Sequence, residues 1–389
     1  MSAAPVRGFP VSEFEQRTQR AQRMMRDLKI DAMLLTTEPY VRYFTGFFTQ
    51  FWLSPTRPWF LLVPAQGKPI AVIPTIGVVG MLDTWIDDVR SWSSPQPGDD
   101  GISLLTSAIR ELPGKYGRLG VPIGIESHLR MPAMDFERLK ANLSNTEVVD
   151  CALLMLALCN IKSAAEIEKI KYVCELTSDS FNALPGFAKA GDSERDIVKA
   201  MRIDLLQRGA DHTPFMVSAS GQNGYDNIIM GPTDRVLENG DLLIIDTGTL
   251  YDGYYCDFDR NFAFGHASDD SKRAYDTVFQ STEAGFAAAK PGNTTSDIWR
   301  AMWKVLEAGG AEGNDIGRMG HGLGTQLTEW PSNTATDNTE LLPGMVLTLE
   351  PGMSYDGGKQ MVHEENILIT DSGAIMLSKR AAAELPIIG

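Results

Sequence analysis

Apolar residues recur with helical and strand-like periods along the first part of the chain, and the two periods alternate. An amphipathic segment predicts a helix, whereas short apolar runs bounded by turn residues predict strands. The predicted elements are a helix over 13–28, strands over 31–35, 59–63, 69–73 and 123–126, and a helix from Pro132. Strands and helices that alternate in this way are typical of a small α/β domain.

The pattern changes at Ser163. Ser163 and Glu166 have the spacing of a capping box, which predicts the start of a long helix. Turn sequences such as Asn239-Gly240-Asp241 then separate apolar runs and predict antiparallel strands, so the second part is expected to be α+β. The helical period recurs over about 163–189, 193–208, 269–290 and 295–309. Because 389 residues exceed one ordinary core, we expect two domains, residues 1–158 and 159–389.

The composition is that of a soluble globular protein, with 43% apolar and 22% charged residues. The net charge of −15 disfavours nucleic acid or an anionic membrane as a partner. The N-terminal residues contain no apolar signal-peptide region, and the 4 cysteines are not spaced as a metal site. We therefore expect a cytoplasmic protein with reduced thiols.

Two aspartates lie inside apolar segments, where an ionised carboxylate requires a partner. Asp246 ends a run of four large aliphatic residues, and Asp257 lies among Tyr, Cys and Phe residues eleven positions later. Burying a carboxylate is costly unless it is paired, hydrogen-bonded or bound to a metal. The two aspartates therefore predict a metal site or a catalytic site.

Three further candidate ligands occur in similar settings. His321 lies in a glycine-rich loop, Glu350 directly follows an apolar run, and Glu365 directly precedes another. With the two aspartates they supply four carboxylates and one imidazole, whose four negative charges would balance two divalent cations. Oxygen-rich ligation suits Mn, Zn, Co or Fe, and a pair of such ions activates a water molecule and holds the attacking and leaving groups.

The order of these residues, and several phrases around them, resemble the pita-bread metallopeptidases, the superfamily of methionine aminopeptidase, aminopeptidase P, prolidase and creatinase. The supporting phrases are Ser220-Gly221-Gln222-Asn223, Pro232-Thr233-Asp234-Arg235, Asp246-Thr247-Gly248, Gly320-His321-Gly322, Leu349-Glu350-Pro351-Gly352 and Glu364-Glu365-Asn366. The residues before the capping box resemble the creatinase/prolidase N-terminal domain, so the resemblance covers essentially the whole chain.

The resemblance implies a pita-bread catalytic domain, a homodimer and a dinuclear metal centre. It also implies that Glu350 serves as general base in addition to binding metal. The implied ligands are Asp246, Asp257, His321, Glu350 and Glu365.

Two histidines carried by peptidase members of this superfamily are missing from the chain. One should precede the Pro-Thr-Asp-Arg phrase, where the chain has Ile228 and Ile229. The other should directly precede Glu329, where the chain has Thr328. Since one positioned proton-transfer group contributes on the order of 100- to 10,000-fold, we expect the metal chemistry to be kept and the substrate to differ.

Other residues are candidates for the site, and each has a structural alternative. Asp259, which stands where the superfamily has Thr, would orient a ligand or form a salt bridge with Arg260. His363 would hold a substrate carboxylate or serve only the core. Further candidates are His212, Tyr225 and Trp330 for substrate binding. Thr328 is a candidate for contacting and orienting a metal ligand without binding the metal itself.

The residues and the resemblance together predict a dinuclear-metal hydrolase similar to prolidase and aminopeptidase P. A metal-bridging hydroxide would cleave an amide bond of a small substrate, such as an Xaa-Pro dipeptide or an N-acyl compound, while Glu350 transfers the proton. Two alternatives remain open: a metal-dependent lyase or hydrolase acting on a small zwitterionic osmolyte of the dimethylsulfoniopropionate type, and a binding protein that has lost catalysis.

Overall fold

The chain divides into two compact units in a computed structural model that describes residues 3–313 and 317–389. One unit is Val6–Cys159, and the other is Asn160–Gly389 together with an N-terminal stretch that ends at Pro5. The Tyr251 hydroxyl donates a hydrogen bond of 2.7 Å to the carbonyl of Pro5, which attaches this stretch to the second unit.

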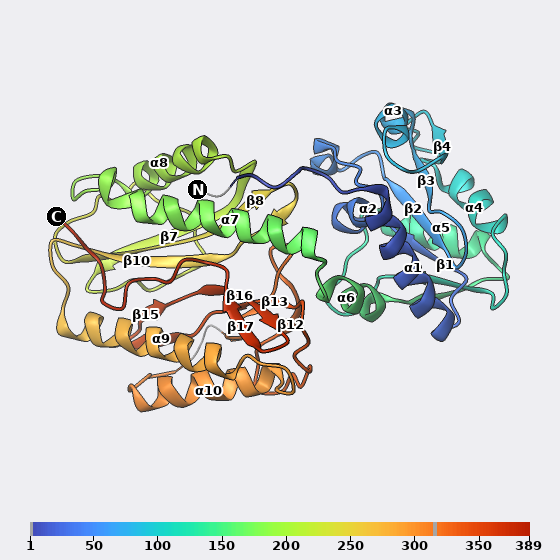
Figure 1. Cartoon of the computed structure of the whole chain (residues 1–389). Helices are drawn as coiled ribbons and strands as arrows, with labels where there is room; N and C mark the ends of the chain where they lie inside the picture. Colours follow the sequence, from blue (N-terminus) through green and yellow to red (C-terminus); the bar gives the residue numbers. More distant parts are fainter. Residues whose placement is uncertain (1–2, 314–316) are drawn as a thin grey trace. The chain divides into compact units, whose positions relative to one another are not determined.

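The first unit is built on one mixed sheet of six strands (Figure 1). The strand order is β4 (Asp88–Trp92), β3 (Ile70–Pro74), β2 (Phe60–Pro64), β1 (Ala32–Leu35), β5 (Arg118–Val121) and β6 (Glu147–Asp150). The pairs β1–β2 and β2–β3 are antiparallel, while β3–β4, β1–β5 and β5–β6 are parallel.

Both faces of this sheet are buried, because successive side chains of a strand point to opposite faces. Met33 and Leu35 of β1 belong to one apolar cluster, and Ala32 and Leu34 belong to another. The first cluster includes residues of α1 (Val11–Asp27), α2 (Glu38–Thr45) and α6 (Ala152–Asn160), and the second includes residues of α4 (Ile102–Arg110) and α5 (Ala133–Asn142). Helices on both faces explain the continuous apolar runs of β1 and β2.

The strand predicted at 123–126 is wrong, because the strand of this region is β5, Arg118–Val121, parallel to β1. The backbone N–H groups of Ile123 and Gly124 instead donate to Oδ1 of Asp150, at 3.0 and 2.9 Å. A side-chain acceptor that takes these donors competes with a strand ladder.

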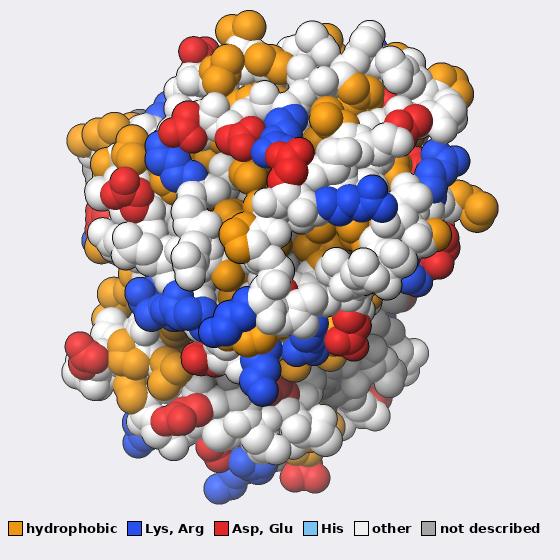
Figure 2. Space-filling model, turned by 90° about the vertical axis from the view of Figure 1, so that its right-hand side faces the viewer, with side chains coloured by type: hydrophobic (Ala, Val, Ile, Leu, Met, Phe, Trp, Pro, Cys, Tyr) orange, Lys and Arg blue, Asp and Glu red, His pale blue; other side chains and the backbone are white. Residues whose placement is uncertain are grey.

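The surface of the first unit carries isolated apolar side chains. Phe48, Leu53 and Val79 are exposed. Figure 2 shows a face on which hydrophobic side chains are interspersed with basic and acidic ones. Single exposed apolar residues of this kind are normal for a folded protein.

The second unit begins with α7 (Ala164–Ala183), and its predicted capping box is confirmed. The Ser163 hydroxyl accepts the N–H of Glu166, and the Glu166 carboxylate accepts the N–H of Ser163. The other helices of the unit are α8 (Glu194–Arg208), α9 (Asp269–Ala288) and α10 (Thr295–Ala308).

Two sheets of the second unit lie between the two pairs of helices (Figure 1). One has the order β18 (Ile387–Ile388), β10 (Phe258–Phe264), β8 (Asp241–Tyr251) and β7 (His212–Gln222), with β9 (Tyr254–Tyr255) paired to β8. The other has the order β12 (Glu329–Ser332), β11 (His321–Gly322), β13 (Val346–Leu349), β16 (Glu365–Thr370) and β17 (Gly373–Met376), and β14 (Gly352–Tyr355) pairs with β15 (Lys359–Val362). Helices α7 and α8 cover the first sheet, and α9 and α10 lie beside the second, which confirms the expected α+β fold.

Two of the sequence phrases that carried the resemblance form one polar network at the edge of β7 and β8. Arg235 donates to both oxygens of the fully buried Asp241 carboxylate, at 2.7 and 2.9 Å, and also to the Ser220 hydroxyl. Glu194 accepts from Ser220 and Thr233. These phrases therefore hold the strands in register and leave the ligand-bearing end of β8 free.

All four cysteines are buried free thiols. Among the described residues, the helices are too short or too polar for any of them to cross a bilayer.

A buried ion pair anchors the loop before β12 to the entry of α7. Lys162 Nζ lies 2.9 Å from Glu329 Oε2, and both side chains are at most 5% exposed. The other oxygen of Glu329 accepts the backbone N–H groups of Thr325 and Gln326. The pair and these two hydrogen bonds therefore hold the segment from Thr325 to Glu329 in place.

Replacing Lys162 by Ala should lower the free energy of unfolding by about 3–5 kcal/mol, because Glu329 would keep a buried charge without its counter-ion. Lys68→Ala is the matched control, since it opens an exposed pair with Asp87 and should cost less than about 1 kcal/mol. Urea-unfolding midpoints followed by circular dichroism measure both changes. Equal shifts for the two variants would contradict a structural role for the buried pair.

Candidate metal centre

Four of the five predicted ligands come together in the second unit, and Glu364 joins them in place of Glu365. Asp246 lies within β8, Asp257 lies between β9 and β10, and His321 begins β11. Glu350 directly follows β13, and Glu364 directly precedes β16. Strands distant in sequence therefore bring these side chains together.

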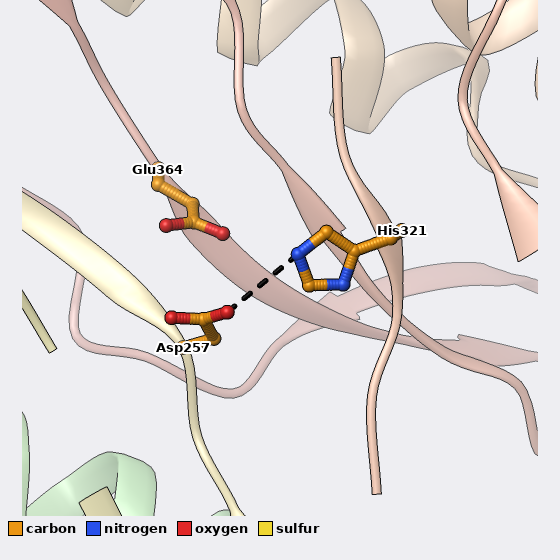
Figure 3. A group of neighbouring side chains, drawn as sticks. All are labelled: Asp257, His321 and Glu364. Carbon is orange, nitrogen blue, oxygen red and sulfur yellow. Dashed lines mark ion pairs between the residues drawn. The ribbon is translucent and has the colours of Figure 1, made fainter. Parts of the chain in front are cut away.

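Asp257, His321 and Glu364 form the tightest group (Figure 3). One ligand atom from each residue lies within 4.8 Å of the other two, and all three residues are buried. His321 Nε2 is 3.5 Å from Asp257 Oδ2 and 4.0 Å from Glu350 Oε2. The imidazole therefore stands between the carboxylates of two different sheets.

The ring of His321 presents a free nitrogen lone pair to these acids. Its Nδ1 lies 2.8 Å from the carbonyl oxygen of Gly322, which only accepts hydrogen bonds, so Nδ1 carries the proton. Burial and then the charge of Arg318 lower the pKa of His321 to about 4. The neutral tautomer with a free Nε2 is the form in which histidine binds metal ions.

The register of β13 and β16 decides which of two adjacent glutamates faces this group. Leu349 pairs with Glu365, so the same antiparallel register carried one residue further brings Glu350 opposite Glu364. Since side chains alternate between the faces of a strand, Glu350 and Glu364 share one face, and Glu365 shares the other with Leu349. The expectation that Glu365 belongs to the ligand group is therefore corrected, because Glu364 lies beside Asp257 and His321 instead.

The Glu365 carboxylate has its own set of partners. Arg260 Nη2 and Arg380 Nη1 each donate to it at 3.0 Å, and the N–H of Ala381 donates at 2.9 Å. The Ser378 hydroxyl donates to the same carboxylate. Glu365 is fully buried and satisfied by these donors, so it holds the C-terminal segment against β16.

Three carboxylate oxygens of the group are buried without a hydrogen-bond partner among the described residues. They are Asp246 Oδ1, Asp257 Oδ1 and Glu364 Oε1. Orphaned buried oxygens are costly unless a cation or a proton compensates them. The donor set of carboxylates and a neutral imidazole therefore fits divalent cations.

Burial raises the pKa of Asp246 to about 7, and burial together with the charge of Asp246 raises the pKa of Glu350 to about 8. Burial, and then neighbouring carboxylates, also raise the pKa values of Asp257 and Glu364 well above the usual range. These acids lie close enough to repel one another, and a divalent cation would replace their protons.

The side-chain amide of Asn366 fixes the backbone beside Asp257. Its Oδ1 accepts the N–H of Asp257 at 3.0 Å, and its Nδ2 donates to the carbonyl of the same residue. Neither Asn366 nor Glu364 was predicted as a site residue, because their selection depends on the register that pairs Thr348 with Asn366, which no local sequence signal contains.

Asp259 lies directly opposite Asp246 in the ladder of β8 and β10 and is buried. Its carboxylate accepts from Asn261 Nδ2 at 3.4 Å. The predicted alternative of a salt bridge between Asp259 and Arg260 is wrong. The guanidinium of Arg260 pairs with Glu365, and the only atom of Asp259 to which it donates is the backbone carbonyl oxygen. Burial and the charge of Asp246 raise the pKa of Asp259 well above its usual range.

The predicted role of His363 in binding a substrate carboxylate does not agree with its position. The ring is 1% exposed, its Nδ1 lies 2.9 Å from Thr282 Oγ1, and Tyr275 and Phe279 pack against it edge-on. Burial lowers the pKa of His363 well below its usual range, so the ring is uncharged. His363 shares the core side of the chain with Glu365.

The remaining candidates are dispersed. Tyr225 is buried, and its hydroxyl donates to Asn261 and accepts from the N–H of Val362, so both hydrogen-bonding functions of the hydroxyl are used within the fold.

Trp330 and Thr328 lie at the start of the second sheet. Trp330 is partly exposed on β12, and the hydroxyl of Thr328, two residues earlier, accepts from Arg318. His212 is exposed at the start of β7, five residues from Val217, the partner of Asp246. At about 3.3 Å per residue this places His212 roughly 16 Å along the strand from Val217.

Comparison with known proteins bears on both units. The model of metallopeptidase family M24 matches residues 168–371, and the model of the creatinase/prolidase N-terminal domain matches residues 17–158. The Xaa-Pro dipeptidase of Pyrococcus horikoshii is 30% identical over 261 residues, which span 66% of this chain and 73% of that protein. The uncharacterized peptidase YqhT of Bacillus subtilis is 29% identical over 362 residues, which span 91% of this chain and 95% of that protein.

Solved structures share the fold over nearly the whole chain. The prolidase from Thermococcus sibiricus superimposes with a TM-score of 0.86 at 24% identity, covering 98% of this chain and 100% of that one. The dipeptidase PepE from Mycobacterium ulcerans superimposes with a TM-score of 0.85 at 24% identity, covering 98% and 99%. The family match and the shared fold establish that this chain is a metallohydrolase that belongs to metallopeptidase family M24.

Proposed function

We propose that this protein is a dinuclear-metal-dependent hydrolase that cleaves an amide bond of a small substrate, such as a dipeptide or an N-acyl amino acid. The observation that carries the proposal is the set of orphaned buried oxygens of Asp246, Asp257 and Glu364 around the neutral ring of His321. The dipeptidases among its relatives support an amide as the bond that is cleaved.

The proposed metal ligands are Asp246, Asp257, His321, Glu350 and Glu364, with Glu364 in the place first given to Glu365. Four carboxylates and a neutral imidazole carry four negative charges, which two divalent cations would balance. When bound, such cations supply an activated water molecule and polarise the carbonyl of the substrate.

The residues of the chain perform the proton transfers. The carboxylate of Glu350 would accept a proton from the attacking water and deliver it to the leaving nitrogen, so that an amide and water give a carboxylic acid and an amine. Its position 4.0 Å from His321, directly after β13, puts it at the edge of the acidic group. His321 keeps its own proton on Nδ1, held by Gly322, and takes no part in the transfer.

The substrate preference is proposed to differ from that of ordinary members, because the two expected imidazoles are absent. Thr328 is occupied by a hydrogen bond from Arg318, and Ile229 is exposed in the segment between β7 and β8. An osmolyte-cleaving lyase and a binding protein without catalysis are the two outcomes that a substrate test can separate from a hydrolase.

We also propose that the protein forms a homodimer, as the resemblance to creatinase and prolidase implies. Exposed apolar residues of the first unit, including Phe48 and Leu53, are available for such contact. Light scattering coupled to gel filtration would report a mass near twice 42.7 kDa. A monomer mass at micromolar concentration would contradict the proposal.

The metal-loaded protein should hydrolyse one or more small amides, and a chelator should abolish this turnover, because the proposed water activation depends on bound cations. Elemental analysis should find two divalent ions per chain. A panel of Xaa-Pro dipeptides, acylated amino acids and zwitterionic osmolytes, followed by chromatography of the products, tests the proposal. Turnover of osmolytes alone would favour the lyase, and a metal-free chain without turnover would favour the binding protein.

Glu364→Gln should weaken metal binding by more than the roughly 10- to 100-fold that changes to neighbouring groups typically cause, because it removes a proposed ligand charge. Glu365→Gln is the matched control, since it should lower thermal stability by loosening Arg260 and Arg380 while keeping metal affinity within about tenfold. Calorimetric titration with Mn²⁺ or Zn²⁺ measures both. The reverse ranking of the two variants would refute the proposed ligand set.

Glu350→Gln should reduce turnover by on the order of 100- to 10,000-fold or more, because an amide can neither accept the proton nor supply the ligand charge. Glu307→Gln, at an exposed position on α10, serves as the control and should keep the activity of the unchanged protein. Steady-state kinetics on the best substrate of the panel measures the change. Comparable rates for the two variants would exclude Glu350 as the base.

A further inference from the structure

Arg318 is a charged residue beside the acidic group that neither the sequence nor the resemblance singled out. It lies three residues before His321 and is half-buried. Its Nη2 donates to Thr328 Oγ1 at 3.2 Å, and its Nη1 lies 3.5 Å from Ser332 Oγ. Ser332 is the strand partner of His321, so the guanidinium is held next to the imidazole.

The charge of Arg318 acts on the metal-centre residues. Burial and neighbouring carboxylates raise the pKa values of Glu350 and Asp257. The positive charge of Arg318 acts in the opposite direction and lowers both pKa values. The contact of Arg318 with Ser332, the strand partner of His321, places the guanidinium on the His321 side of the group.

The guanidinium retains unused donors. Arginine has five N–H donors, and the two partners of Arg318 are neutral hydroxyl groups. Among the residues that the structure describes, no carboxylate forms an ion pair with Arg318, in contrast to Arg260, Arg235 and Arg380 of the same unit. A half-exposed guanidinium without an anionic partner is a receptor for a carboxylate, which it binds through two parallel hydrogen bonds.

We propose that Arg318 anchors the free carboxylate of the substrate, so that the enzyme selects small amides that end in a carboxylate, such as dipeptides and N-acyl amino acids. The inference rests on the proposed function for its choice of substrates and adds the group that recognises them. His363, the residue expected to bind the carboxylate, is buried and uncharged in the core. Another residue with a positive charge is therefore required for this role.

Arg318 contacts the residue at the place of one absent imidazole. The hydroxyl of Thr328, where the histidine was expected, accepts a hydrogen bond from Arg318. The group on this side of the acids is therefore a permanently charged donor, which binds an anion and does not exchange protons.

The test compares a dipeptide or N-acyl amino acid with its C-terminal amide, on the metal-loaded protein and on Arg318→Gln. The unchanged protein should prefer the free acid about 10- to 100-fold in kcat/KM, mainly through KM, because one charge-assisted bidentate contact is worth this much. Arg318→Gln should lose the preference, because KM should rise for the acid and not for the amide. Arg318→Lys, which keeps the charge without the planar fork, should restore part of it.

Arg300→Gln is the control variant, because Arg300 is exposed on α10 in an ion pair with Asp297 and should leave the preference unchanged. An equal loss of kcat on acid and amide in Arg318→Gln would overturn the carboxylate anchor. So would an unchanged preference for the acid. A fold check by circular dichroism and metal content accompanies each variant, and the acid-against-amide comparison on the unchanged protein tests the inference even where a variant fails to fold.

A binding experiment separates this inference from the proposed function. Calorimetric titration of the metal-loaded protein with proline or N-acetylproline, and with the corresponding amides, needs no turnover. Binding of the acids that weakens at least tenfold in Arg318→Gln supports the anchor even if no amide is cleaved. Hydrolysis without any preference for a carboxylate would leave the proposed function standing and refute the anchor.

Discussion

The second unit is organised by the cost of burying carboxylates without hydrogen-bond donors. Asp246, Asp257 and Glu364 each keep a buried oxygen that no described residue satisfies. Burial raises the pKa values of all three, and neighbouring carboxylates raise those of Asp257 and Glu364 further. Such an arrangement is stable only when cations or protons compensate it. The two sheets therefore serve to hold acids from distant strands at one place, and the divalent metals used by the family are the natural compensation.

Two other buried acids of the unit have all the hydrogen-bond donors that the metal-centre acids lack. Asp241 and Glu365 are also buried, but each accepts hydrogen bonds from arginine and from further donors. Each therefore stabilises the fold and does not need a cation. The difference lies in the partners supplied by neighbouring elements, since the residue types are the same. Arg235 fixes the edge of β7 and β8, and Arg260 with Arg380 fixes the C-terminal segment against β16.

The proposed substrate selection depends on a group outside the acidic cluster. The segment from β11 to β12 is attached to the entry of α7 by the buried pair of Lys162 and Glu329, and next to it Thr328 and Ser332 hold Arg318. A fixed position of the guanidinium relative to the acids would let one ligand contact both. The threonine at one expected imidazole position and the cation that it contacts thus belong to one local arrangement.

The sequence by itself determined most of the elements, the capping box at Ser163, the α+β class and four of the five residues that converge, because period, turn residues and acids in apolar runs are local signals. The tertiary structure decided between Glu364 and Glu365. Two adjacent glutamates are equivalent in a sequence, and only the register of β16 against β13 directs one to Asp257 and His321 and the other to Arg260. It also decided that His363 belongs to the core and that Arg318 faces the acids, since a contact between strands depends on register and packing that no local pattern contains.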